Sequence, residues 1–296
     1  MIKVTSFPNL QEFVPIKKLD DYTVSSFDGE WFIYGKDNSK DKIVGRYYFG
    51  NNEFSGLNEC YVDLLFGDCH LIDNSFIQNL SQYLNKRIYE LEYEIHLFFL
   101  EYTNTLNGFE RLSVENILKL DVYSVVTLVE KDLFGKTKER IKGEFTVRTF
   151  EEKDSHNVIS CLVDSYKMGI SLGGFVDLVD FQRLEQNIVQ YYNEFFLSKN
   201  TIIFIAEKNG EFVGHITFEM HDEKAVLVDS YVLNKFSGNG VYDLLKRKFE
   251  NFCISNEITV LEGSVEPHSE KSLKILENLK QNGWREKSYI GRFNIK

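Results

Sequence analysis

The chain of 296 residues is 43% hydrophobic and 15% aromatic, with a formal net charge of −11. This length favours two domains of about 150 residues each, and the acidic balance argues against nucleic-acid or membrane partners, which need a basic surface. No apolar run reaches the roughly 20 residues that cross a bilayer, and the N-terminus lacks a secretion-signal pattern, so we expect a cytoplasmic protein, either a monomer or a homodimer.

The four cysteines offer no framework for a metal or for disulfides. Cys60, Cys69, Cys161 and Cys253 lie far apart in the sequence, without a C-x-x-C pair or a neighbouring pair of histidines. Zinc sites and small disulfide-rich domains need a closer or more regular spacing. We therefore expect free thiols in a reducing compartment, and no metal.

The first half of the chain carries an α/β pattern. Residues 31–49, WFIYGKDNSKDKIVGRYYF, contain two strand-like runs around a polar turn, as in a hairpin. A strand that opens with Tyr61-Val62-Asp63 follows, and then a helix over 75–91 with apolar residues at helical spacing. Further strands are expected at 94–102 and 122–130, with Gly108-Phe109 between them.

The same order of elements returns in the second half. The polar segment 135–144 marks a boundary, and a strand and two helices, the second near 181–196, follow it. Then come a hairpin at 203–218, a strand at 225–233, a helix at 241–252, a strand at 257–265, Gly283-Trp284 and a strand at 289–294. Such agreement indicates two copies of one α/β unit, residues 1–142 and 143–296, each closing on its own last strand.

One loop in the second copy has a composition suited to anions. The strand at 225–233 runs into Ser237-Gly238-Asn239-Gly240 and then directly into a helix. A helix start leaves about four backbone N–H groups unpaired and carries a partial positive charge, and glycine lets a phosphate approach the backbone. The loop is either a pyrophosphate site or an ordinary strand-to-helix turn.

The second copy resembles the GNAT acetyltransferase superfamily, whose pyrophosphate loop has the form V-x-P-x-x-[QR]-G-x-G-[IV]-[GA]. The residues that match are Val232, Gly238, Gly240 and Val241, and those that depart are Asn234, Ser237 and Tyr242. The resemblance implies an α/β (α+β) fold of two tandem units, each a mixed, mostly antiparallel sheet flanked by helices, and acetyl-CoA as co-substrate. It implies a coenzyme site at Val232, Leu233, Ser237, Gly238, Asn239, Gly240, Val241 and Tyr242.

The corresponding loop of the first copy argues against a second coenzyme site. It reads LLFGDCHLIDNSF, with a single glycine, Gly67, and the acidic residues Asp68 and Asp73 where a phosphate would need amides. We expect this copy to cover the open side of the second and to shape the acceptor pocket, or to give structural support alone.

Acetyl transfer from a thioester to an amine needs donors for the carbonyl, a base and an acid. The resemblance implies backbone N–H donors near Val232 and Leu233. Asp229, three residues before Val232 in an otherwise apolar run, is the first candidate for the base, and His215 is the second. An outward-facing Asp229 with the structural role of Asp63, or a surface His215, is the alternative.

Other candidates carry less weight. Glu219 and His268 are comparable outsiders for the base. The family often places a tyrosine, as the acid, four residues before the glycine of its k-x-GF segment, which QNGWREKSYI resembles. Leu279 occupies that position here, and Tyr289 or Tyr231 could replace the tyrosine.

Together these features indicate an N-acetyltransferase that moves an acetyl or short acyl group from coenzyme A to a primary amine of a small molecule. An amino sugar or sugar nucleotide is the preferred acceptor, and a polyamine, aminoglycoside or amino acid is possible. The loop around Gly169, Gly173 and Gly174, with Asp177 and Asp180, would meet the acceptor or be a simple connector. The alternative function is a non-catalytic binding or scaffold protein on two degenerate GNAT folds.

Overall fold

The computed structural model describes residues 2–5, 30–35, 42–113, 116–117, 119–120, 122–133, 144–172, 174–195, 198–266 and 270–293. Its strands are β1 (Ile2–Thr5), β2 (Glu30–Gly35), β3 (Lys42–Asn51), β4 (Asn58–Phe66), β5 (Leu97–Thr103), β6 (Val122–Asp132), β7 (Phe145–Thr149), β8 (Thr201–Lys208), β9 (Glu211–His221), β10 (Lys224–Val232), β11 (Val260–Val265) and β12 (Arg285–Phe293). Its α-helices are α3 (Asn74–Leu91), α5 (Ser155–Leu172), α6 (Phe181–Phe195), α7 (Val241–Ser255) and α8 (Glu270–Gln281).

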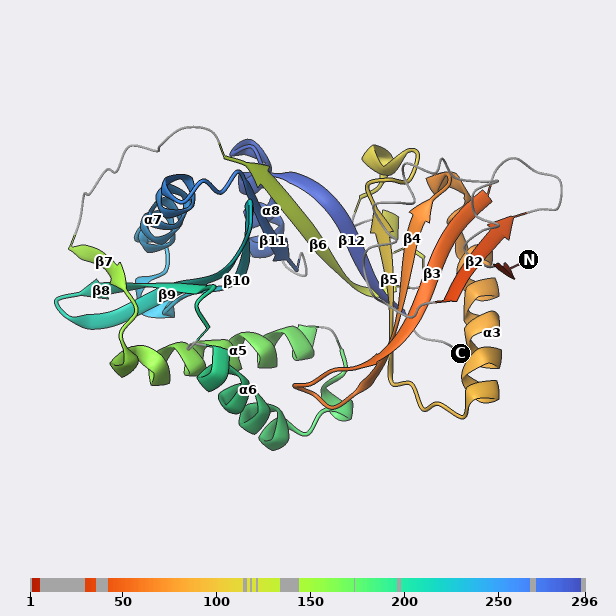
Figure 1. Ribbon diagram of the computed structural model, residues 1–296, viewed down its shortest axis with the longest axis horizontal. Coiled ribbons are helices and arrows are strands. Elements are labelled where there is room, and N and C mark those ends of the chain that lie inside the picture. The colour runs from red at the N-terminus through yellow and green to blue at the C-terminus, as the bar shows by residue number, and fades with distance from the viewer. Residues whose placement is uncertain are drawn as a thin grey trace.

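The strands join one hydrogen-bonded sheet in the order β1-β2-β3-β4-β5-β12-β6-β11-β10-β9-β8-β7. Only β4–β5 and β10–β11 pair in parallel, and the other neighbours are antiparallel. Figure 1 shows the first half of the sheet on the right and the second half on the left, with helices beside each. The expected fold class, two similar mixed α/β units, is confirmed.

The closing strands of the two units are exchanged. β6, from the first half, pairs with β11 of the second half over Thr127 to Asp132. β12, from the second half, inserts between β5 and β6, and the two long strands bridge the halves side by side in Figure 1. The expectation that each half closes on its own last strand is therefore wrong, because sequence alternation specifies the face of a strand but not its partner.

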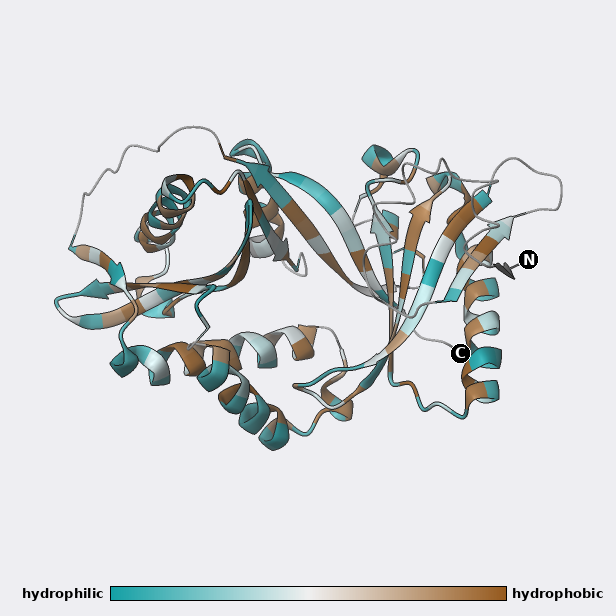
Figure 2. Cartoon of the chain, viewed as in Figure 1, coloured by the Kyte–Doolittle hydropathy of each residue, from teal (hydrophilic) through white to brown (hydrophobic). Residues whose placement is uncertain are grey.

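Helices pack on both faces of the sheet in the second half. Along β8, Ile203 and Ile205 lie in one buried cluster with α5 and α6, whereas Phe204 and Ala206 lie in another with α7. Since successive residues of a strand point to opposite faces, the two groups of helices cover opposite sides of β8. These helices carry both hydrophobic and hydrophilic residues along their length (Figure 2), as expected for one packed and one solvated face.

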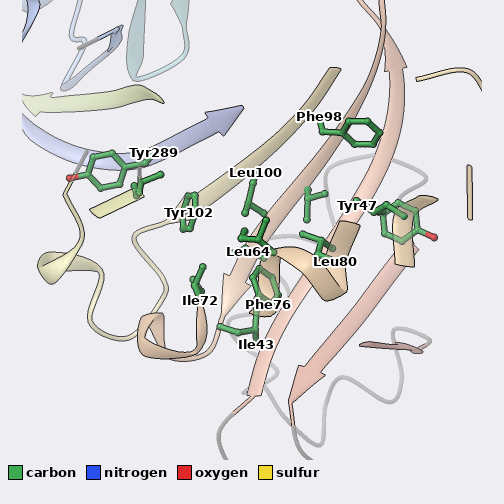
Figure 3. Packing of buried hydrophobic residues seen from close by; sticks show 14 of the residues in the cluster. Ile43, Tyr47, Leu64, Ile72, Phe76, Leu80, Phe98, Leu100, Tyr102 and Tyr289 are labelled. Carbon is green, nitrogen blue, oxygen red and sulfur yellow. The ribbon is translucent and has the colours of Figure 1, made fainter. Parts of the chain in front are cut away.

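The first half has its own buried cluster, formed by strands β3 to β5 and α3. Phe76, Leu80 and Leu84 recur at helical spacing along α3 and are fully buried in this cluster, and Figure 3 shows the first two against the sheet. β6 and β12 tie the two halves together. Val125 of β6 lies in the first-half cluster, whereas Val129 lies in the cluster of α7.

The cysteines are free thiols, as expected, and Cys60, Cys161 and Cys253 are buried. Among the described residues, no group of three or more histidine, cysteine or acidic side chains could hold a metal ion. None of the described helices is both long enough and apolar enough to cross a membrane. Most of the expected boundary segment 135–144, together with Gly173 and His268, falls outside the described residues.

Candidate functional site

The second half of the sheet opens between β10 and β11. The two strands pair only from Lys224 to Val226 of β10, although β10 continues to Val232. A register shift on the β9 side, between Leu227 and Asp229, follows at once. A bulge bends a strand and strengthens its twist, so it accounts for the separation of β10 from β11. The result is a stretch of β10 whose backbone on this side has no strand partner.

Hydrogen bonding along β9 shows which backbone groups face this opening. The amide of Leu233 donates to the carbonyl of Val213 at 2.9 Å, so this amide is already paired. In an antiparallel ladder the next residue turns its N–H the other way, and the amide of Val232 therefore faces the opening. Of the two amides expected near the thioester carbonyl, Val232 is available and Leu233 is bonded.

The loop after β10 is exposed and ends in a helix start without a side-chain cap. Gly238 and Gly240 have φ of +79° and +77°, values that glycine adopts without strain. A Cβ added at either position would meet no atom within 4 Å. Gly240 is the residue before α7, and no side chain of the described residues caps this helix end.

This helix start has the donors that an anion needs. The first amides of α7, from Val241 onward, precede any intrahelical acceptor, and the helix dipole adds a partial positive charge. Ser237 and Asn239 are exposed on the loop, and Tyr242 is 37% exposed. An open glycine loop, free amides and exposed neighbours are what a pyrophosphate group requires, so the residues present fit the expected coenzyme.

The structure brings Asp229 and His215 together. The two face each other across β10 and β9, with 3.3 Å between Asp229 Oδ2 and His215 Nε2. The other ring nitrogen of His215, Nδ1, lies 3.1 Å from Thr217 Oγ1. His215 is completely buried, whereas the Asp229 side chain is 16% exposed, so only Asp229 can reach a substrate. The burial of His215 argues against it as the base, and Asp229 remains the first candidate.

Helix α5 encloses this pair from one side. Burial, and then the carboxylates of Asp229 and Asp164, raise the pKa of the Cys161 thiol to about 12. A thiol that stays protonated cannot serve as a nucleophile at neutral pH. Burial, then Asp164, Cys161 and Asp229, also raise the pKa of Tyr231, so this phenol keeps its proton beside the base.

Tyr289 lies away from Asp229. It is 1% exposed and belongs to the first-half cluster, with its ring 5.3 Å from that of Phe109. Figure 3 shows it on β12 at the border of this cluster. The strand exchange explains the position, because β12 pairs with β5 of the other unit. A phenol buried there has no route to an acceptor, and Tyr231 is the better candidate for the acid.

Two other positions singled out in the sequence prove to be structural, and a hollow on α6 is peripheral. Asp180 caps α6, since its Oδ1 accepts the amides of Gln182 and Arg183. Leu279 is buried in the α7 cluster and offers no proton. A hollow of about 710 Å³ lies on α6 between Gln182 and Asn193, and none of its lining residues belongs to the opening of β10.

The hairpin between β3 and β4 is a contact that sequence reasoning did not locate. Phe54 at its tip lies 5.0 Å from the ring of Tyr166 on α5 and 4.9 Å from Tyr191 on α6. Asn187 of α6 donates to the carbonyls of Glu53 and Phe54. Burial raises the pKa of Tyr166, and the negative charge of Asp229 adds to this shift. Through Phe54 the first unit therefore contacts the helices that enclose the candidate base. The signal for this contact in the sequence was a single phenylalanine, Phe54, within an otherwise polar turn.

The matching loop of the first half is closed by its own carboxylates. Asp73 precedes α3 and accepts the amide of Phe76 at 2.8 Å. Asp68 accepts the amide of His70 and lies 2.7 Å from its ring. A Cβ on Gly67 would lie 2.2 Å from the carbonyl oxygen of Lys42, so this glycine serves a close backbone contact.

Comparison with known proteins finds a family match within the second half of the chain. Residues 175–279 match the acetyltransferase (GNAT) family. A GCN5-related N-acetyltransferase from Sphaerobacter thermophilus has a similar structure, with a TM-score of 0.59 and 12% identity over 100% of this chain and 96% of that one. A functionally unknown conserved protein from Staphylococcus epidermidis gives 0.51 and 11% identity, over 92% and 96%. Both likenesses concern the fold.

A tandem GNAT protein from the clavulanic acid biosynthesis pathway is more distant, with a TM-score of 0.43 and 9% identity over 90% of this chain and 83% of that one. At this score the likeness adds nothing to the assignment of the fold. No curated protein sequence matches the chain.

Proposed function

We propose that the chain is an N-acetyltransferase acting on a primary amine of a small molecule, on the premise that residues 175–279 match the acetyltransferase (GNAT) family. The observation that carries the proposal is the combination of an opened β10 with an uncapped glycine loop, Ser237 to Gly240. Bound coenzyme A would supply the acetyl group as a thioester, with its pyrophosphate at the amides of this loop and of the first turn of α7.

Three groups on β10 would take separate roles in acetyl transfer. Asp229 would accept the proton that the amine loses, and the amide of Val232 would donate to the thioester oxygen. Tyr231, whose raised pKa keeps the phenol protonated, would give a proton to the departing sulfur. In the net reaction an N–C bond forms, an S–C bond breaks, and one proton passes from nitrogen to sulfur.

The acceptor side would be formed by α5, α6 and the hairpin with Phe54. After burial, the carboxylates of Asp164 and Asp229 help to raise the pKa of Tyr231. A site with this negative charge attracts an ammonium group. Amino sugars and their nucleotides are the preferred acceptors, and polyamines, aminoglycosides and amino acids follow. The first half would serve as a wall of this site and as a support for the sheet.

Titration calorimetry with acetyl-CoA, followed by an amine screen, tests the proposal. We expect one binding site per chain, and thiol release with at least one amine of a panel containing glucosamine, spermidine, an aminoglycoside and an amino acid. Asp229→Asn should lower turnover about 10²- to 10⁴-fold and leave coenzyme binding intact. Absence of binding at millimolar coenzyme would contradict the proposal and leave a non-catalytic scaffold as the function.

A further inference from the structure

We propose that His215 and Thr217 are positioning residues that hold the Asp229 carboxylate toward the acceptor. The inference rests on the proposed function, since it assigns a role to groups behind the proposed base. His215 is completely buried, and so is Thr217. The described contacts of the His215 ring nitrogens lead to two groups, Thr217 Oγ1 at 3.1 Å and Asp229 Oδ2 at 3.3 Å.

The partners of the ring determine where its proton lies. Asp229 as a carboxylate can only accept a hydrogen bond, and a threonine hydroxyl can donate or accept. If Nε2 carried a lone pair, it would face the carboxylate oxygen and repel it. In the proposed arrangement Nε2 carries the ring proton and directs it at Asp229 Oδ2, 3.3 Å away, and Thr217 donates to Nδ1.

Neither His215 Nε2 nor Asp229 Oδ2 completes a hydrogen bond among the described residues, so their 3.3 Å approach is a polar contact that is not aligned as a hydrogen bond. A buried polar atom without a partner is costly, so a small movement that completes the hydrogen bond between the two groups would stabilise both. The 3.3 Å separation is at the long end of hydrogen bonding. Small movements of β9 against β10 then control how firmly Asp229 is held.

A held carboxylate matters for transfer. Asp229 lies next to the bulge where β10 leaves β11, so its backbone is not fixed by a parallel neighbour. Without the histidine, the carboxylate would sample other rotamers and would reach the productive position less often. Loss of the positioning pair should therefore lower turnover and leave coenzyme binding unchanged.

Heteronuclear NMR of the full chain tests the arrangement without any enzymatic activity. With ¹⁵N-labelled histidine, we expect His215 to show a protonated Nε2 and an unprotonated Nδ1. Asp229→Asn and Thr217→Val should each shift these signals, and the signals of His221 should not move. A ring with its proton on Nδ1 alone, or signals insensitive to Asp229→Asn, would overturn the proposal.

Kinetics with isosteric variants test the consequence. His215→Phe and Thr217→Val should lower turnover about 10- to 100-fold, with the same dissociation constant for acetyl-CoA. His215→Gln, which keeps an amide donor, and Thr217→Ser, which keeps the hydroxyl, should recover part of the loss. In an Asp229→Asn background, His215→Phe should have no further effect. Effects that multiply instead would overturn the positioning role.

A matched control lies on the same strand. His221 Nε2 is 3.1 Å from Glu219 Oε2, but this pair is exposed, and His221→Phe should leave turnover unchanged. The outcomes also separate the two proposals. A chain that transfers no acetyl group but has the expected His215 signals would refute the proposed function and leave the hydrogen-bonded arrangement established.

Discussion

The loops after β4 and β10 occupy equivalent places in the two units, yet their helix starts are satisfied differently. The Asp73 carboxylate caps α3 by accepting the amide of Phe76, whereas α7 begins at Val241, after Gly240, without a cap from any described side chain. A capped helix start needs no ligand, and an uncapped one has donors to spare. The capping carboxylate of Asp73 is thus one of the differences between the two loops.

The strands before these loops also differ in how far they pair with the next parallel strand. β4 pairs with β5 from Glu59 to Leu64, but β10 pairs with β11 only as far as Val226. The first unit is therefore a closed sheet and the second an open one. The comparison indicates that ligand binding in this architecture needs both an open strand and an uncapped helix.

The largest expected effect comes from separating the units. Residues 143–296 alone would lack β6, so β11 would lose its longer partner and β12 would lose both neighbours. We expect this fragment to remain unfolded or to aggregate, because exposed strand edges associate, whereas the full chain unfolds in one cooperative transition. Circular dichroism during heating checks both. A fragment that folds and binds coenzyme with full affinity would contradict the importance of the exchange.

The second prediction places one substitution in each unit. Gly240→Glu adds a side chain and a negative charge at the loop, and we expect acetyl-CoA affinity to fall about 100-fold, equivalent to about 2.7 kcal/mol. Gly108→Glu introduces the same residue at nearly the same φ, +79°, in the first unit, and should leave affinity unchanged. Calorimetry compares the two, and equal losses would disprove a coenzyme site at Gly240.

The third prediction uses the glycine that follows a valine in both hairpins. A Cβ on Gly214 would lie 2.3 Å from the Tyr231 carbonyl oxygen, and one on Gly45 would lie 2.7 Å from that of Asp63. Both alanine variants should lose roughly 1–3 kcal/mol of unfolding free energy, as overpacking does. Only Gly214→Ala should also weaken coenzyme binding, because it displaces β10. Urea unfolding and calorimetry measure the two effects, and unchanged binding in Gly214→Ala would speak against β10 as the coenzyme strand.

The smallest effect concerns the capped helix. Asp73→Ala should cost about 1 kcal/mol of unfolding free energy through loss of the helix cap. Binding should stay at one acetyl-CoA per chain, because β4 and β5 remain closed. A second site appearing in this variant would mean that the cap alone blocks the first unit.

The sequence predicted the elements of this fold better than their partners. Periodicity located α3 and α7 to within a few residues, because Phe76, Leu80, Leu245 and Phe249 bury one helical face. The exchange of β6 and β12 could not be foreseen, since strands with equivalent faces can pair with either unit. For the same reason Tyr289, which the sequence offered as the acid, lies in the first-half cluster and away from the opening of β10.

Within the candidate site, local chemistry was predictable and burial was not. Gly238 and Gly240 signalled the loop because positive φ favours glycine. Asp229 and His215 were each plausible, but nothing in the sequence placed them 3.3 Å apart. Their pairing depends on the register of β10 on β9, with Asp229 opposite Thr217, and a bulge of one residue sets that register.

The exchanged strands also constrain how such a gene could change. If the first half binds no coenzyme, as we propose, deletion would ordinarily be free to remove it. Here its loss would remove β6 from beside β11 and leave β12 without β5, so the second half would lose these strand pairings. The first unit is thus retained because β6 pairs with β11 of the second unit, even if the surface of the first unit changes.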